Sequence, residues 1–128
     1  MSKKTTEFAE DDEFYIVDVR AEFTGNPYIT LWRAKNAGYA YPTQWAGRYT
    51  RKQIDAEAHY YHKPRFGHKR TLDRYPVPCG IVDDLGVEPS PGIIDGNAGL
   101  VLRNTPEVRK ALRRARYIPE ASDRKVEA

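Results

Sequence analysis

Three histidines and one cysteine, His59, His62, His68 and Cys79, are the residue types that could bind a transition metal. His59 and His62 are three positions apart, a spacing that permits shared ligation at the end of a helix. Their HxxH pattern lacks the intervening glutamate of a protease motif, and the other two ligands would come from a loop and a strand. We therefore expect the histidines to form a polar rim of a basic surface, and we predict no metal and no cofactor.

Cys79 is also a candidate nucleophile, because it stands in the segment PVPCG, where a following helix N-terminus would lower the pKa of its thiol. Nothing in the sequence supplies the base and the oxyanion donor that such a site needs. Val77 and Ile81 flank the cysteine, which favours a small buried side chain. As the only cysteine, it cannot form an internal disulfide.

Carboxylates and glycines give no stronger indication of catalysis. Asp83, Asp84 and Asp95 could bind a cation or act as acid and base, but their spacing matches no calcium loop and is typical of turns. The segments GVEPSPG and GNAG lack the Lys-Ser/Thr ending and the preceding strand of a phosphate-binding loop. Because no catalytic constellation is complete, we predict a protein that is not an enzyme.

Aromatic and basic residues are concentrated in one region instead. Ten of the fifteen aromatic residues lie between Tyr28 and Tyr75, together with ten basic residues. Such a mixture is typical of surfaces that stack bases, of protein interfaces and of small cores, so we expect most rings to be buried and two to four to be exposed. The first predicted binding set is Trp32, Arg33, Tyr39, Tyr41, Trp45, Arg48 and Tyr49, a group that could hold a nucleotide between its rings.

The charge pattern predicts a second binding set. The net charge of +3 averages over an acidic segment at residues 1–13, a basic one at 14–80, an acidic one at 81–100 and a basic one at 101–128. If the two basic segments meet, they form a positive face for a phosphate backbone or an acidic protein; the alternative is a solvated mosaic of charges. The second set is Arg65, Lys69, Arg70, Arg109, Arg113 and Arg116.

The elements that must position these residues follow from periodicity and turn chemistry. Strands are predicted at 14–20, 28–34, 38–42, 75–79 and 100–102, with the segment TGNP as the turn of the first hairpin. The basic stretch 62–74 is predicted to be an exposed loop, and 75–79 a short edge strand. Residues 87–99 form a long irregular connection.

Two main helices are predicted. The first starts at Arg51, because Thr50 and Gln53 have capping-box spacing, and buries Ile54, Ala58 and Tyr61. The second follows Asn104, Thr105 and Pro106 and buries Val108, Leu112 and Ala115. Residues 79–86 are expected to form a single turn that buries Ile81, Val82 and Leu85.

Together these elements predict an α+β fold, a small antiparallel sheet of three to five strands with the two main helices packed on it. We expect an acidic flexible N-terminus (1–13), one domain (14–118) and a disordered tail (119–128). A chain of 128 residues is too short for most multi-domain enzymes. No stretch is apolar over the length of a membrane span, and the N-terminus lacks the apolar core of a secretory signal.

Two stretches carry a resemblance: YITLWRAKNAGYAYPTQWAGRYT (28–50) and VPCGIVDDLGVEPSPGIIDGNAGLVLRNT (77–105). A strand ending in Trp-Arg, a Gly-Tyr turn, a Trp-Ala-Gly segment and a Val-Pro-Cys segment are similar to a family of small uncharacterised proteins of tailed phages and prophages. The stretches cover about 40% of the chain, which departs from the family pattern at Ala34 and Lys35 and has a longer basic run at 63–74. The resemblance implies a genomic setting and transfers no activity or site.

Small phage proteins of this type often bind and inhibit a host machine. We therefore predict a non-enzymatic accessory protein in the cytoplasm of the infected bacterium. It would inhibit a host protein or nucleoprotein complex, including a defence system in the manner of anti-CRISPR proteins. The alternatives are a sponge for a nucleotide signal and a direct DNA- or RNA-binding protein. No membrane partner is expected, and the sequence leaves a homodimer open.

Overall fold

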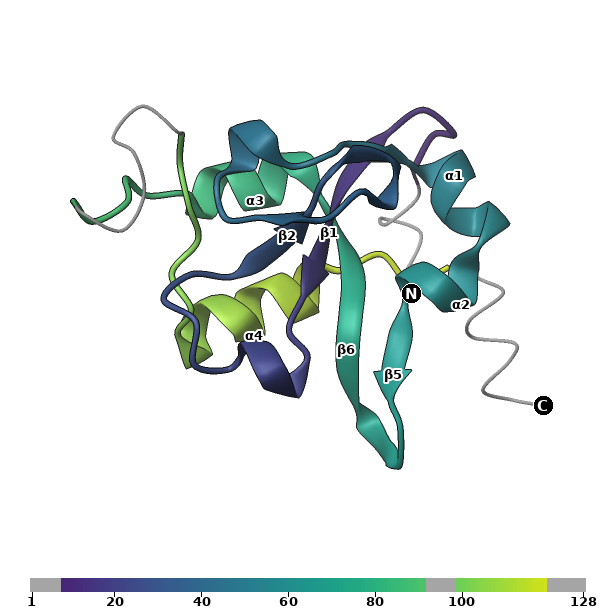
Figure 1. Ribbon diagram of the computed structural model, residues 1–128. Helices are drawn as coiled ribbons and strands as arrows, with labels where there is room; N and C mark the ends of the chain where they lie inside the picture. The colour runs from purple at the N-terminus through teal and green to yellow at the C-terminus, as the bar shows by residue number, and fades with distance from the viewer. Residues whose placement is uncertain (1–7, 92–98, 120–128) are drawn as a thin grey trace.

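The computed structural model describes residues 8–91 and 99–119 and shows an α+β fold built on one antiparallel sheet (Figure 1). The sheet has six strands, more than the three to five predicted. The order is β3-β2-β1-β6-β5, and β4 pairs with the half of β1 that β2 leaves free. The strands are β1 (Glu13–Asp18), β2 (Thr30–Trp32), β3 (Tyr39–Ala40), β4 (Tyr49–Thr50), β5 (Lys63–Arg65) and β6 (His68–Pro78).

β1 is the central strand, and every residue after its first is buried. Because successive side chains of a strand point to opposite faces, Tyr15 and Val17 pack in one core cluster and Phe14 and Ile16 in another. The predicted hairpin is confirmed, since β1 and β2 pair antiparallel with Val17 opposite Leu31. The sheet therefore has a core on each face.

Helices cover both faces of the sheet. They are α1 (Arg51–Ala56), α2 (Ala58–Tyr61), α3 (Cys79–Leu85) and α4 (Pro106–Ala115). Val82 of α3 and Leu112 of α4 pack in one cluster, and Ile54 of α1 and Tyr61 of α2 in the other. α4, together with the α1–α2 pair, corresponds to the two main helices predicted. None of the helices described has the length and apolarity needed to cross a membrane.

Both predicted helix starts are confirmed. The Thr50 hydroxyl accepts a hydrogen bond from the Gln53 backbone N–H at 3.2 Å, and the Gln53 side chain accepts one from the Thr50 N–H at 2.9 Å. In α4, the Thr105 hydroxyl accepts from the Val108 N–H at 3.2 Å, and Pro106 occupies the first turn, where a missing N–H costs nothing. The predicted buried faces are also present, with Ile54 and Leu112 fully buried.

The first helix is not continuous, however. It breaks at Glu57, whose φ of −133° and ψ of 52° are not helical, so α1 and α2 are separate. The break lets two residues adjacent in sequence contact the same ring: the centroids of Tyr60 and Tyr61 lie 5.5 and 6.0 Å from that of Trp32. The helix is therefore interrupted at the point where both tyrosines pack against Trp32.

The basic loop predicted at 62–74 was wrong, because Lys63–Arg65 and His68–Pro78 form the strands β5 and β6. The strand predicted at 75–79 is present at 75–78 as the end of β6, which lies between β1 and β5 rather than at the edge of the sheet. β6 pairs with β1 from Asp18↔Arg74 to Phe14↔Pro78. The sheet accommodates the charged residues of this stretch because Arg74 is buried against the Trp32 ring and Asp73 forms an ion pair with Arg65. Pro76 is tolerated because its backbone faces away from β1, where its carbonyl accepts the Tyr117 N–H at 2.9 Å.

Three smaller differences remain. Residues 100–102 form no strand, since Val101 makes only an isolated bridge with Val87. Residues 79–85 form the whole of α3 rather than a single turn, and Ile81 is 40% exposed because it lies on the side of the helix opposite the core. Phe8 packs on the Phe14 ring at 5.0 Å between centroids. The predictions for residues 1–7, 92–98 and 120–128 lie outside the described residues.

A buried carboxylate lies beside the Trp32 ring. Asp18, at the end of β1, is 1% exposed, and its oxygens accept hydrogen bonds from Arg20 Nε (2.9 Å), Arg20 Nη2 (2.6 Å) and Trp32 Nε1 (2.9 Å). Arg74 stands opposite on β6, with its Cζ 5.0 Å from the Trp32 ring centroid and 4.7 Å from that of Tyr60. Ionised donors and ring faces therefore compensate the burial of charge.

Replacing this carboxylate should destabilise the whole fold. We expect Asp18→Asn to lower the free energy of unfolding by about 2–4 kcal/mol, because Arg20 and Arg74 keep their charges and lose the anion. Urea unfolding followed by circular dichroism measures the change. Asp84→Asn, on the exposed side of α3, is the matched control and should change stability by less than about 0.5 kcal/mol. Equal stabilities of the two variants would contradict this role.

Candidate functional site

The first predicted binding set divides between the core and the surface. Trp32 and Tyr49 are buried, at 4% and 3% exposure, and pack in the cluster that contains Phe14. The Tyr49 hydroxyl donates to the Arg33 carbonyl at 2.5 Å and accepts from the Asn36 N–H at 2.9 Å. These two rings therefore position the loop that follows β2 and are not themselves available to a partner.

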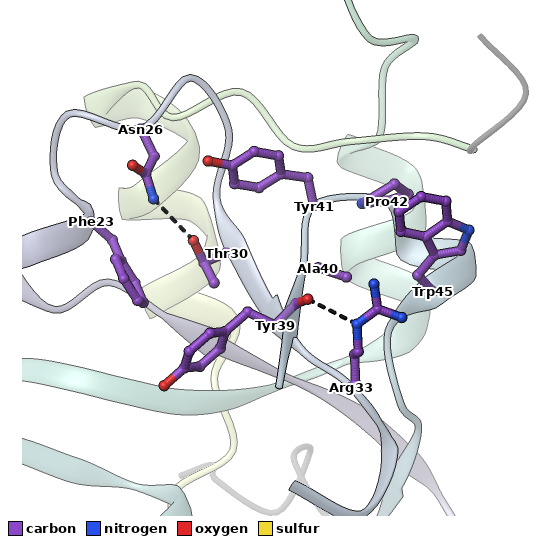
Figure 2. Close-up of a pocket in the computed structure, with 9 residues that line it drawn as sticks. All are labelled: Phe23, Asn26, Thr30, Arg33, Tyr39, Ala40, Tyr41, Pro42 and Trp45. Carbon is purple, nitrogen blue, oxygen red and sulfur yellow. Dashed lines mark hydrogen bonds between the residues drawn. The ribbon is translucent and has the colours of Figure 1, made fainter. Parts of the chain in front are cut away.

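Four other residues of the set lie outside the core and line one open pocket, which Figure 2 shows. They are Arg33, Tyr39, Tyr41 and Trp45. The cavity has a volume of about 300 Å³. Its other lining residues, which the sequence did not indicate as a site, are Phe23, Asn26, Thr30, Ala40 and Pro42. We call this cavity the aromatic pocket. Four of the ten rings between Tyr28 and Tyr75 are exposed by more than 40%, as predicted.

Cations stand close to the rings of this pocket. The guanidinium carbon of Arg33 lies 5.3 Å from the Trp45 ring centroid, and Arg33 Nε donates to the Tyr39 carbonyl at 2.9 Å. On the other wall, Arg20 lies 4.9 Å from the Phe23 centroid and 5.5 Å from that of Tyr39. The pocket can therefore hold a flat or apolar group, with an arginine placed to receive an acceptor or a negative charge.

Backbone constraints hold the wall that contains Trp45. A Cβ on Gly47 would lie 2.4 Å from the Ala34 Cα, so only glycine fits this close approach. Lys35 and Asn36 both have positive φ, at 58° and 57°. The hydrogen bond from the Asn36 N–H to the Tyr49 hydroxyl fixes this unusual turn. These contacts restrict the backbone conformation of the segment 34–47.

Asn104, which the sequence indicated only as part of a helix start, holds the opposite wall. The Asn104 amide donates to the carbonyls of Phe23, Thr24 and Asn26 at 3.3, 3.1 and 2.9 Å. Its own oxygen accepts from Arg109 Nη1 at 2.6 Å. Thr105, not Asn104, is the residue that caps α4. Asn104 therefore ties the loop 23–26 to the helix.

Arg48 lies apart from the aromatic pocket. Its guanidinium carbon is 5.3 Å from the Tyr15 ring centroid, and its nitrogens are 3.3 Å from Glu13 and 3.7 Å from Asp83. The Tyr15 hydroxyl donates to Asp83 at 3.1 Å. Arg48 is therefore engaged in a local network at the N-terminal end of β1.

The second predicted set converges in part. Arg65, Arg109 and Arg113 line one groove, joined by Lys110, whereas Arg70 contributes its carbonyl to Arg113 Nη2 at 2.5 Å. Arg116 lies elsewhere and donates from Nε to His62 Nε2 at 3.1 Å. The Lys69 side chain lies outside what the structure describes. We call the first group, with its cavity of about 440 Å³, the basic groove.

The candidate catalytic residues are poorly placed for chemistry. Cys79 is 6% exposed, and burial raises the pKa of its thiol to about 12, although Arg48 acts in the opposite direction. A neutral, buried thiol suits packing better than nucleophilic attack. Within residues 8–91 and 99–119, apart from the His68 side chain, no three His, Cys, Asp or Glu side chains converge as metal ligands. His59 is exposed, whereas His62 is half-buried.

No family model, curated protein or solved structure matches this chain. The resemblance of residues 28–50 and 77–105 to phage proteins therefore stays a prediction.

His62 generates a prediction on pH. Burial, aided by the charge of Arg116, lowers its pKa from 6.5 to about 4. The unfolded chain therefore binds this proton more readily between pH 6.5 and 4, so the stability that neutral His62 contributes is complete above pH 6.5 and is lost as the pH falls toward 4.

Unfolding experiments at pH 7 and pH 5 should show this loss. Wild type should lose about 1–2 kcal/mol more than His62→Gln between these two values, because glutamine can accept the Arg116 bond but does not titrate. His59→Gln is the matched control for an exposed histidine and should retain the wild-type difference. Parallel pH profiles for wild type and His62→Gln would contradict the assignment.

Proposed function

We propose that this chain is a non-enzymatic accessory protein, encoded by a phage or prophage, that inhibits a host target by binding it through the aromatic pocket. The observation that carries the proposal is that Phe23, Tyr39 and Trp45 line one open cavity beside Arg33. Aromatic and arginine side chains are the residue types that dominate binding energy at protein interfaces. The host partner is a protein or nucleoprotein complex in the bacterial cytoplasm, including a defence complex.

The chemistry of the pocket lining supports binding rather than catalysis. Its described lining residues offer rings, one amide, the three hydroxyls of Thr30, Tyr39 and Tyr41, and one guanidinium, and include no carboxylate, imidazole or thiol. These groups orient and desolvate a partner but cannot exchange a proton near neutral pH. The loop bearing Trp45 is also fixed by Gly47 and Asn36, so little order has to be gained on binding. A rigid ring-lined cavity suits one inserted side chain of a partner.

Phage plating tests this proposal. In a host whose defence system restricts a phage, expression of the wild-type protein should raise the efficiency of plating. Trp45→Ala should lose at least about tenfold of that rise, because it removes an exposed ring of the size that acts as a binding hot spot. Phe66→Ala is the matched control: Phe66 is 95% exposed in the β5–β6 turn and lies outside the pocket.

Thermal unfolding must show both variants to be folded. Protection that is unchanged by Trp45→Ala would remove the pocket from the mechanism. If the wild-type protein protects phage in none of the restricting hosts tested, the proposed inhibitor function is wrong.

The same geometry supports a nucleotide sponge as the second candidate function. A cavity of about 300 Å³ is at the lower end of small-ligand sites and matches one base, which rings on its walls could stack. Isothermal titration calorimetry with cyclic and linear nucleotides should then show one saturable site, which Tyr39→Leu weakens and Phe66→Ala leaves unchanged. No saturable binding at micromolar protein would reject this alternative.

A further inference from the structure

The basic groove is a second surface, separate from the aromatic pocket. It lies between α4 and the β5–β6 hairpin, and cations from both sides line it: Arg65 on β5 and Arg109, Lys110 and Arg113 on α4. No carboxylate is among the described residues that line it. Figure 1 shows β6 and α4 as neighbouring elements, and the hairpin extending beyond the body of the sheet.

The charges of this groove are largely uncompensated. Among the cations of the groove, only Arg65 has a carboxylate partner in residues 8–91 and 99–119, Asp73 at 2.9 Å. Arg109 and Arg113 donate to neutral oxygens, those of the Asn104 amide and the Arg70 carbonyl, at 2.6 and 2.5 Å. Lys110 is exposed and makes no hydrogen bond or ion pair with the described residues. The protein thus orients two guanidinium groups without neutralising them, which leaves the groove ready for an anion.

The groove also has apolar walls. Val19, Leu72 and Tyr75 line it between the cations. Burial raises the pKa of Tyr75 to about 12, so its ring remains neutral. A site for inorganic phosphate alone would need only the cations. Apolar surface between cations suits a ligand that alternates charged and uncharged parts, as a sugar–phosphate chain does.

The aromatic pocket stands directly beside the groove. Phe23 lines the pocket and the next residue, Thr24, lines the groove, so one stretch of backbone separates the two openings. Asn104 binds the carbonyls of both residues, and Arg109 in the groove holds Asn104. A ligand that crosses this loop would meet cations on one side and exposed rings on the other.

We propose that the basic groove binds the phosphates of a single-stranded nucleic acid, whose bases reach the rings beyond Thr24. Single strands offer both groups that this surface recognises, backbone phosphates and unstacked bases, whereas a duplex encloses its bases. An acidic peptide would match the cations but would leave the rings unused. The bases would meet the Phe23 and Tyr39 end of the aromatic pocket, whereas Trp45 stands at its other end and does not line the groove. Substitution of Trp45 therefore tests host inhibition separately from nucleic-acid binding.

Fluorescence anisotropy with a labelled short oligothymidylate, and with oligouridylate of the same length, tests the proposal. Binding should saturate at low salt, with log K falling by about 2 per tenfold rise in salt, which corresponds to about three phosphate contacts. DNA and RNA should bind alike, since phosphate and base are common to both. The corresponding duplex should bind at least about tenfold more weakly, because its bases are closed to the rings.

Charge variants locate the binding. Lys110→Glu should weaken it by about tenfold and flatten the salt dependence, and Lys110→Gln should have a smaller effect of the same sign. Lys52→Glu is the matched control, an exposed lysine of α1 with the same change in charge on the other face of the sheet. It should bind within about twofold of wild type. Both lysines are exposed, so thermal unfolding of the three variants should be unchanged.

Several results would overturn the proposal. They are no saturable binding at low salt, equal affinity for the duplex, competition by polyglutamate as strong as by unlabelled oligothymidylate, or equal losses in Lys110→Glu and Lys52→Glu. If the Trp45→Ala variant no longer protects phage but still binds the oligonucleotide normally, host inhibition and nucleic-acid binding depend on different residues.

Discussion

Burying the Asp18 carboxylate in the central strand is costly unless charged or polar donors surround it. Arg20 and Trp32 supply those donors, and both are thereby fixed in orientation. Arg20 continues outward over the rings of Phe23 and Tyr39, so the same buried charge orients a wall of the aromatic pocket. Trp32 is directed inward, and its ring faces Arg74 on β6. One carboxylate thus connects the core to the surface.

Two surfaces result from this arrangement, and the loop 23–26 separates them. The aromatic pocket is rigid and mostly apolar, whereas the basic groove is cationic with apolar walls. The Asn104 side chain donates from its amide nitrogen to the loop and accepts from Arg109 at its oxygen. The host-inhibition proposal uses the aromatic pocket, and the nucleic-acid proposal uses the basic groove together with the rings of Phe23 and Tyr39 on the near wall of the pocket.

The sequence predicted elements whose signals are local. The capping box at Thr50 and the proline start of α4 need only neighbouring residues, and the alternation in β1 reflects a period of two. It did not predict β6, because the partners that neutralise or cover Arg74 come from distant segments. It also joined Trp32 and Arg33 in one binding set, although they are adjacent residues at the end of a strand and lie on opposite sides. Only the strand pairing separates the ring that supports the fold from the arginine that can bind.

The two indole N–H groups provide the most direct test of this division. Because Trp32 Nε1 is buried and donates to Asp18, its hydrogen exchange should require opening of the core and be slow. Trp45 is 46% exposed and should exchange at nearly the rate of a free indole. Hydrogen exchange followed in ¹H–¹⁵N spectra, with assignment by Trp45→Phe, should show one slow and one fast indole signal. Two fast signals would contradict the Asp18 anchor, and two slow ones would contradict the open aromatic pocket.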